Sequence, residues 1–354
     1  MAARTCYCSA SYQHRPQQYT LSTATQTTPV ASISTPLEQL AALHKALADQ
    51  LRLQILRLLT HESFGVLELC RILDIRQSAL SHHLKILANA QLVSTRREGN
   101  SIFYRRTFLT DGDELRDLKA AVFAQIDKLP IVAGQERKIR QLQLERSQLS
   151  LNFFNRNANK FHEKQGLIVA HDEYSNVLHD VINSLGLSTD ATVLEVGPGE
   201  GQMLVELAER FARVTGLDNS VDMLERSQAA VTAAGHTQVE LIHGDTSVAL
   251  GNNISSDLII FEMVMHHISS PARTFQDCAA LLKPGGYLLV VELAPHDQEW
   301  VREACGDLWL GIEKQDLDRW ALDAGLIIDQ GSYLQLRNGF QIQIRVFKRG
   351  THGT

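Results

Sequence analysis

The sequence has no run of eighteen or more apolar residues, and its five cysteines are scattered and odd in number. The first absence excludes a membrane-spanning helix, because such a helix needs about 20 consecutive apolar residues. The second argues against a disulfide-stapled secreted domain and favours the reducing environment of the cytoplasm. A hydrophobic fraction of 44% and a charged fraction of 21% are ordinary for a globular protein, and 354 residues favour two domains.

Charge is distributed unevenly along the chain. Residues 37–106 hold ten Lys/Arg against six Asp/Glu, a net charge of +4, whereas residues 181–349 hold twelve against twenty-three, a net charge of −11. This asymmetry predicts that a small basic domain meets a polyanion and that the larger acidic domain does not. Residues 1–36 are rich in Ser, Thr and Gln without apolar periodicity, so we expect a disordered leader there.

A buried-strand pattern runs into three glycines at alternate positions in the stretch Val193-Leu-Glu-Val-Gly-Pro-Gly-Glu-Gly201, and an amphipathic helix follows at once. Strand, glycine turn and helix in this order predict a ligand cradle, because glycine lets the backbone approach a ligand closely. Glu195 precedes the first glycine by two positions. A carboxylate there repels a pyrophosphate but suits a cationic amino group, so the pattern favours S-adenosylmethionine (SAM) or S-adenosylhomocysteine (SAH) over a dinucleotide.

Further strand patterns follow at 214–218, 239–245, 257–261 and 288–293. Successive strand–helix units predict a mostly parallel sheet with its ligand at the carboxyl ends of the strands. Asp218 lies 21 residues beyond Gly197, the separation expected for a carboxylate that accepts hydrogen bonds from a ribose diol. The predicted nucleoside-binding residues are Glu195, Gly197, Gly199, Gly201, Asp218, Asn219, Met223, Asp245 and Thr246.

The basic N-terminal part shows apolar residues at helical spacing from Pro36 onward, with further helices expected from near Asp49, Val66 and Gln77. Two β-rich runs within residues 92–106 then flank a Glu-Gly-Asn turn, which predicts a hairpin. Helices followed by a hairpin predict a winged helix-turn-helix, whose recognition helix enters the DNA major groove. The expected DNA contacts are Arg76, Gln77, Ser78, Ser81, His82, Lys85, Arg96 and Arg97, with Arg105 and Arg106 also bracketing the wing.

Residues 107–150 are predicted to form a helical connector. One helix is expected over residues 114–128, where Pro130 ends it, and a charged, Gln-rich helix over residues 135–149. A helical entry segment to the next domain is expected to begin at Phe153. The Gln-rich helix either pairs with a second copy of the chain or acts as a solvated spacer.

The segments Ala46-Leu-Ala-Asp-Gln-Leu-Arg-Leu-Gln-Ile-Leu-Arg-Leu-Leu59 and Gln77-Ser-Ala-Leu-Ser-His-His-Leu-Lys-Ile-Leu87 resemble the ArsR-type bacterial repressors, and the resemblance covers residues 37–106. It implies a homodimer that binds an inverted-repeat operator in double-stranded DNA. The metal-sensing members carry Glu-Leu-Cys-x-Cys, but here Ile72 stands at the second cysteine. Metal sensing is therefore not expected, and Cys70 is predicted to be a buried apolar residue.

The glycine motif, Asp218, Asp245 and Lys283-Pro-Gly-Gly286 together resemble class I SAM-dependent methyltransferases that act on small molecules. The resemblance implies an α/β, Rossmann-like domain over residues 151–349. Fusion of the two domains, together with Leu293-Ala-Pro-His-Asp297, resembles the SAH-responsive repressors of bacterial methionine-cycle genes. One departure is Cys305-Gly-Asp-Leu-Trp-Leu-Gly311, which differs from the His-rich, Arg-containing form found in many fused homologues.

Candidate catalytic residues are Glu262, His266 and His267, which follow the fourth strand, and a histidine there would serve as a general base. The alternative is that one histidine packs in the core and the other contacts only the ligand. No metal site is expected, because adjacent side chains diverge. No Asn/Asp-Pro-Pro-Tyr or Pro-Cys motif occurs, and Cys278 and Cys305 form no thiol cluster for arsenic methylation. Two hypotheses follow: a regulator that senses SAM or SAH, and an active small-molecule methyltransferase with an autoregulatory DNA-binding domain.

Overall fold

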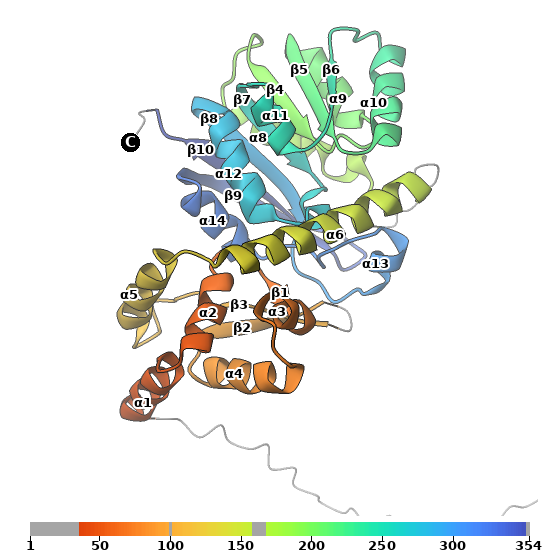
Figure 1. Cartoon of the computed structure of the whole chain (residues 1–354). Coiled ribbons are helices and arrows are strands. Elements are labelled where there is room, and N and C mark those ends of the chain that lie inside the picture. The colour runs from red at the N-terminus through yellow and green to blue at the C-terminus, as the bar shows by residue number, and fades with distance from the viewer. Residues whose placement is uncertain (1–34, 99–100, 158–167, 352–354) are drawn as a thin grey trace, which may run out of the picture.

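The computed structural model describes residues 35–98, 101–157 and 168–351. The leader predicted for residues 1–36 therefore lies almost wholly outside the described residues, as does the turn of the predicted hairpin at residues 99–100. Figure 1 shows a small helical domain (red to orange) beside a larger sheet domain (green to blue), with one long helix between them. Among the helices of the described ranges, none is long and apolar enough to cross a bilayer.

The N-terminal domain is the predicted winged helix-turn-helix. Thr35 caps the first helix through the backbone N–H of Glu38, and Asp49 caps the second through the N–H of Arg52, so both begin where the sequence places capping residues. The apolar faces of its helices meet in one core with the short sheet, which has the antiparallel order β1-β3-β2. The elements are α1 (Pro36–Leu47), α2 (Gln50–Leu58), β1 (Phe64–Gly65), α3 (Val66–Leu73), α4 (Gln77–Asn89), β2 (Val93–Glu98) and β3 (Ser101–Arg106).

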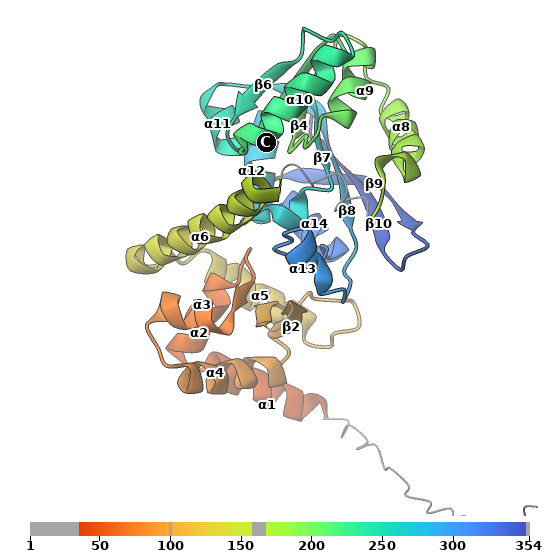
Figure 2. The same ribbon diagram turned by 90° about the vertical axis from the view of Figure 1, so that its right-hand side faces the viewer.

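The connector consists of α5 (Arg116–Asp127) and α6 (Ala133–Asn157). The separate connector helix and entry segment predicted on either side of residue 150 are in fact one helix of 25 residues, so that prediction is wrong. The reason is visible in the sequence, because neither proline nor glycine occurs between residues 135 and 157 to break the helix. Figures 1 and 2 show α6 passing between the two domains.

The C-terminal domain is built on a seven-stranded sheet of order β6-β5-β4-β7-β8-β10-β9. Strands β4 to β8 are parallel, and β10 runs antiparallel to both of its neighbours, β8 and β9. The central strands are nearly continuous runs of buried apolar residues, because helices cover both faces of the sheet. The strands are β4 (Thr192–Val196), β5 (Arg213–Asp218), β6 (Glu240–His243), β7 (Ser256–Glu262), β8 (Leu282–Leu293), β9 (Leu326–Gln335) and β10 (Gln341–Arg349).

Helices cover both faces of this sheet (Figure 2), and their apolar side chains form a separate cluster on each face. One face carries α8 (Ser175–Ser184), α9 (Gln202–Arg210) and α10 (Val221–Ala233), preceded by the 3-10 turn η2 (His171–Glu173). The other face carries α11 (Thr246–Gly251), α12 (Pro271–Leu281) and α14 (Lys314–Asp323). The remaining elements are the 3-10 turn η3 (Met265–His267) and the short helix α13 (Trp300–Ala304).

Candidate functional site

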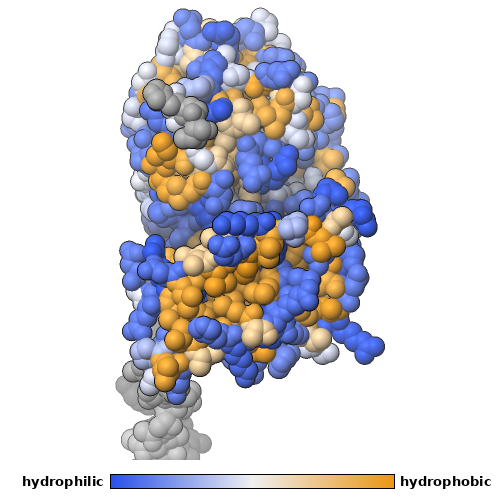
Figure 3. Space-filling view, turned by 60° about the vertical axis from the view of Figure 1, so that its left-hand side comes forward, coloured by the Kyte–Doolittle hydropathy of each residue, from blue (hydrophilic) through white to orange (hydrophobic). Residues whose placement is uncertain are grey.

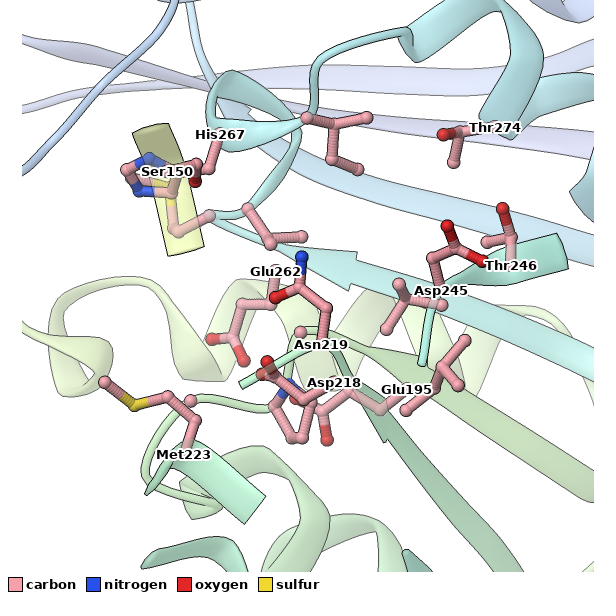
Figure 4. Close-up of a pocket in the computed structure, with 18 of the residues that line it drawn as sticks. Ser150, Glu195, Asp218, Asn219, Met223, Asp245, Thr246, Glu262, His267 and Thr274 are labelled. Atoms are coloured by element: carbon pink, nitrogen blue, oxygen red, sulfur yellow. The ribbon is translucent and has the colours of Figure 1, made fainter. Parts of the chain in front are cut away.

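A cavity of about 640 Å³ lies where β4, β5, β6 and β7 end. Open α/β sheets bind ligands at this edge, because the loops and helix N-termini that follow the strands converge there. Eight of the nine predicted nucleoside-binding residues line the cavity, together with two of the three catalytic candidates. Figure 4 shows several of these side chains around the central space. The two predicted residues outside the lining are Gly201 and His266.

The glycine turn between β4 and α9 is set by three positive φ angles, of 72° at Gly197, 57° at Gly199 and 84° at Gly201. A Cβ atom on Gly197 would lie 2.4 Å from the side chain of Val264 on the cavity wall. A Cβ atom on Gly201 would instead lie 2.9 Å from the backbone of Ser227 on α10. Gly201 therefore permits close packing of α9 against α10, and it lies outside the cavity lining.

Glu195 lies in the cavity wall at the end of β4 and is only 1% exposed. Its Oε2 atom has no hydrogen-bond partner among the described residues. Burial, reinforced by the negative charge of Glu262, raises the pKa of Glu195 well above its usual value. A buried carboxylate oxygen without a partner is costly unless a ligand supplies one, so Glu195 fits the ammonium group of an amino acid bound in the cavity.

Asp218 lies at the tip of β5, and the backbone N–H of Ser220 donates to its Oδ1 atom at 2.8 Å. Burial raises the pKa of Asp218 to about 6. The neighbouring Asn219 and Met223 also line the cavity. On its outer side this loop contacts the connector, because the hydroxyl of Ser220 donates to Oδ1 of Asn155 in α6 at 3.0 Å. The carboxylate predicted to bind a ribose is thus held in a loop that touches α6.

Asp245 and Thr246 stand at the entrance to α11. Asp245 caps this helix, because its Oδ1 accepts hydrogen bonds from the backbone of Ser247 at 3.0 Å and of Val248 at 3.3 Å. The hydroxyl of Thr246 donates to the buried Asp277 at 2.8 Å. Both side chains line the cavity, and contacts within the protein fix their orientation.

Glu262, at the end of β7, belongs to a charged network. Its Oε1 accepts hydrogen bonds from Nδ1 of His171 at 2.6 Å and from the hydroxyl of Tyr174 at 2.8 Å. The other ring nitrogen of His171 lies 2.9 Å from Glu206. Burial lowers the pKa of His171, but the carboxylates of Glu206 and Glu262 together raise it to about 10. Glu262 therefore anchors the η2 turn to the cavity wall. Glu206 also belongs to this network, and no sequence pattern indicated its role.

The recognition helix α4 buries Leu80, Leu84 and Leu87 against the domain core. The opposite face is open to solvent. His83 lies between the two faces, half-buried, with its Nδ1 3.6 Å from Asp49. The predicted DNA contacts on the exposed face, or at the start of the helix, are Arg76, Gln77, Ser78, Ser81, His82 and Lys85.

Two family models match the chain. Residues 49–95 match the family described as bacterial regulatory protein, arsR family, and residues 194–290 match the family described as methyltransferase domain. The chain is an ArsR-family helix-turn-helix domain fused to a methyltransferase domain. We refer to the two parts below as the ArsR domain and the methyltransferase domain.

Similar proteins match the methyltransferase domain. A ubiquinone biosynthesis O-methyltransferase of Serratia proteamaculans is 27% identical over 129 residues, which are 36% of this chain and 54% of that protein. A tRNA 5-carboxymethoxyuridine methyltransferase of Escherichia coli K12 is 33% identical over 106 residues, 29% of this chain and 41% of that protein. The chain thus spans about half the length of these relatives. The crystal structure of magnesium protoporphyrin IX methyltransferase from Synechocystis, with bound SAM, has 18% identity and a TM-score of 0.47 over 58% of this chain and 97% of that one.

The wing of the ArsR domain is docked on the methyltransferase domain. Arg96 donates to the carbonyls of Leu310 at 2.8 Å and Gly311 at 2.6 Å, and it pairs with Glu98 at 2.6 Å. Arg105 pairs with Asp316 at 2.5 Å. In this conformation Arg96 does not face DNA, because two backbone carbonyls of the methyltransferase domain and the carboxylate of Glu98 in the wing itself bind its guanidinium.

Two neighbouring wing arginines behave differently. Arg106 is buried in its own domain, where it pairs with Asp127 at 2.8 Å and donates to the carbonyl of Leu56 at 2.8 Å. In this conformation the side chain of Arg106 is therefore not accessible to DNA. Arg97, by contrast, is exposed on β2. Of the wing residues predicted to bind DNA, Arg97 is the one that this conformation leaves on the surface.

Helix α6 connects the ArsR domain to the cavity. Toward the ArsR domain, Arg146 pairs with Glu68 of α3 at 2.6 Å, and Glu145 pairs with Arg71 at 2.8 Å. The same helix forms part of the cavity wall. Its lining residues are Arg140, Gln143, Leu144, Ser147, Ser150 and Phe154. Sequence reasoning missed these residues because the helix was expected to end before it reached the second domain.

His266 and His267 form the η3 turn after β7. His266 is 2% exposed, and its Nδ1 lies 2.6 Å from Oε1 of the buried Glu292. His267 lines the cavity, with its Nδ1 3.3 Å from the carbonyl of Gly306. The ring centroids are 4.1 Å apart, so the expectation that these side chains diverge is wrong. Both rings turn toward the same loop, which carries Gly306 and Asp307.

Proposed function

We propose that this chain is a DNA-binding transcriptional regulator whose methyltransferase domain binds SAM or SAH as an effector. Its operator would control genes of the methionine or SAM cycle, as in the regulators that the sequence resembles. The observation that carries the proposal is the position of α6, which lines the cavity and also pairs with α3 of the helix-turn-helix. One rigid element therefore contacts both the ligand site and the domain that reads DNA.

The polar groups of the cavity match the two ends of the proposed ligand. Glu195 offers an unpartnered carboxylate oxygen for the ammonium group, and Asp218 offers a carboxylate at a strand tip for the ribose hydroxyls. SAM and SAH share both of these groups and differ by a methyl group and its positive charge. When bound, SAM would in addition supply an electrophilic methyl group.

An effector changes DNA affinity only if it binds the DNA-competent and the incompetent conformations with different affinities. Ligand seated on Asp218 would order the loop that contacts Asn155, near the C-terminal end of α6. Movement of α6 would then be transmitted through the Arg146–Glu68 pair to α3, which packs beside the recognition helix. A tenfold change in operator affinity requires only about 1.4 kcal/mol of coupling.

We further propose that the regulator is a homodimer. In the view of Figure 3, apolar residues (orange) are gathered on the visible face of the ArsR domain. Among the exposed large apolar side chains of this domain and its connector are Leu37, Leu118, Leu129 and Val132, which are 76%, 38%, 54% and 59% exposed. Exposed apolar side chains gathered on one face are typical of a subunit interface, and light scattering of the purified chain gives the oligomeric state directly.

The decisive experiment measures operator binding with and without nucleoside. Duplexes enriched from a random pool by the full-length protein supply the operator, and fluorescence anisotropy gives its affinity alone and with SAM, SAH or adenosine. We expect a change of at least about tenfold with SAM or SAH. The same titrations are run with Glu195→Gln and with the control Glu225→Gln, which alters an exposed residue of α10. If SAM and SAH bind by calorimetry but leave DNA affinity unchanged, the effector role is wrong while the pocket assignment stands.

The second candidate function is an active small-molecule methyltransferase with an autoregulatory DNA-binding domain. It is favoured by the position of His267, which lines the cavity and has one ring nitrogen engaged by the carbonyl of Gly306. The other nitrogen is then available to accept a proton from an acceptor molecule. Transfer of labelled methyl groups from SAM to components of a cell extract, lost in His267→Ala while SAM still binds, would establish this function.

A further inference from the structure

A second group of polar side chains lies behind the cavity wall, apart from the nucleoside-binding residues. His266, His267 and Asp307 each offer one ligand atom, and these atoms all lie within 4.8 Å of one another. His266 and Asp307 are 2% and 3% exposed, and His267 lines the cavity. The proposed nucleoside site uses neither Asp307 nor His266.

Asp307 is the unusual member of this group. Both of its carboxylate oxygens are buried and lack a hydrogen-bond partner among the described residues. Its Oδ1 lies 3.9 Å from Nε2 of His266, which is too far for a hydrogen bond. Burial of a carboxylate with neither oxygen satisfied is expensive, so the arrangement calls for a cation between Asp307 and the imidazoles.

The two histidines present the ring nitrogens that such a cation requires. Glu292 is fully buried, at 0% exposed, and both of its carboxylate oxygens contact His266. Its Oε1 lies 2.6 Å from Nδ1 of His266, and its Oε2 accepts a hydrogen bond from the backbone N–H of His266 at 3.0 Å. A carboxylate that fixes one nitrogen of a histidine, and so directs the other nitrogen outward, is the usual support of a metal-binding histidine. His267 is held in a comparable way by the carbonyl of Gly306.

We propose that His266, His267 and Asp307 bind a divalent transition-metal ion, for which Zn²⁺ is the natural candidate. Two imidazoles and one carboxylate are a donor set of Zn²⁺ and related ions. Two tetrahedral ligands at about 2.1 Å from one ion lie about 3.4 Å apart, so a small rotation of either side chain would bring Asp307 and His266, now 3.9 Å apart, to that separation. His267 lies in the cavity wall, so the fourth coordination position is adjacent to the cavity.

The bound ion would also fix the loop on which the wing docks. The backbone N–H groups of Leu308 and Trp309 donate to the carbonyl of His266 at 3.0 Å and 3.2 Å. The next residue, Leu310, donates to Glu98 of the wing at 2.9 Å. Coordination of Asp307 would therefore tie this loop to the η3 turn through a metal ion as well as through backbone hydrogen bonds.

Cobalt spectroscopy tests the site. Metal-stripped full-length protein carrying Cys6→Ser and Cys8→Ser, which removes the thiols of the leader as competing ligands, is titrated with Co²⁺ and then with Zn²⁺. We expect one equivalent of Co²⁺ with visible d–d absorption, which Zn²⁺ abolishes. Glu292→Gln should weaken Zn²⁺ binding by about 10- to 100-fold, because it supports a ligand without being one. Asp307→Asn and His267→Gln should weaken it further.

Matched controls are Asp329→Asn and His236→Gln, which change an exposed carboxylate and a half-exposed imidazole elsewhere in the same domain. Circular dichroism and thermal denaturation report whether each variant is folded. The proposal is overturned if the parent protein shows no stoichiometric Co²⁺ absorption, whatever the variants do. It is equally overturned if folded Asp307→Asn and His267→Gln proteins bind Zn²⁺ as tightly as the controls.

Discussion

Arg146 of α6 donates two parallel hydrogen bonds to Glu68 of α3, from Nε to Oε1 at 3.0 Å and from Nη2 to Oε2 at 2.6 Å. Its guanidinium also lies 5.0 Å from the ring of Trp309, which belongs to the methyltransferase domain. Arg146 therefore holds the ArsR domain, the connector and the methyltransferase domain together at one point. A paired arginine in this position fixes direction as well as distance, which is what transmission of a small displacement requires.

Replacement of Arg146 should weaken both stability and coupling. We expect Arg146→Ala to lower the free energy of unfolding by about 3 kcal/mol, because it leaves the carboxylate of Glu68 without its largely buried partner. Denaturant titration measures this loss. The exposed Arg137 on the same helix is the control, and Arg137→Ala should change stability by less than about 0.5 kcal/mol. If nucleoside still shifts operator affinity by the full factor in a folded Arg146→Ala protein, coupling does not pass through this contact.

Loss of the charge of Glu195 should weaken nucleoside binding with little effect on the fold. Glu195→Gln preserves the shape of the side chain but removes the charge that would pair with the ligand's ammonium group. A hydrogen bond to a charged group contributes about 1.5–3 kcal/mol, so the dissociation constant of SAH should rise by about 10- to 100-fold. Calorimetry with SAH, compared with Glu225→Gln, checks this value. Unchanged affinity would place the ammonium group elsewhere in the cavity.

The limits of sequence reasoning follow from distance along the chain. Glu195 and Asp218 were predicted because strand ends and glycine turns are local patterns, and parallel strands bring their ends to one edge. The docking of Arg96 on Leu310 joins residues more than two hundred positions apart, and no local signal marks it. The proximity of His266 and Asp307 likewise depends on the return of a distant loop. Only α6 had a local signal that could have been used, namely the absence of any helix breaker.

Nucleoside affinity should depend on pH through Asp218. Because burial raises the pKa of this carboxyl to about 6, it is ionised and can accept ribose hydroxyls above that pH, and it becomes protonated below it. The contribution of Asp218 to SAH affinity should therefore fall as the pH decreases through 6. Calorimetric titrations of SAH between pH 5 and 8 test whether affinity falls with decreasing pH. The Asp218→Asn protein should bind SAH more weakly and should not show the fall in affinity near pH 6. Any dependence that remains in this variant would belong to Glu195, whose pKa burial also raises.

Arg96 and Arg97 are neighbours on β2 with opposite surroundings, and they should respond differently to mutation. Arg97 is exposed, so Arg97→Ala should weaken operator binding and reduce the slope of log affinity against log salt by about 0.9, the value for one phosphate contact. Arg96→Ala should leave that slope unchanged. Instead it removes the hydrogen bonds to Leu310 and Gly311, so amide exchange at residues 308–311 should become faster. Equal salt slopes for Arg97→Ala and the parent protein, with a reduced slope for Arg96→Ala, would mean that the wing leaves its docked position when DNA binds.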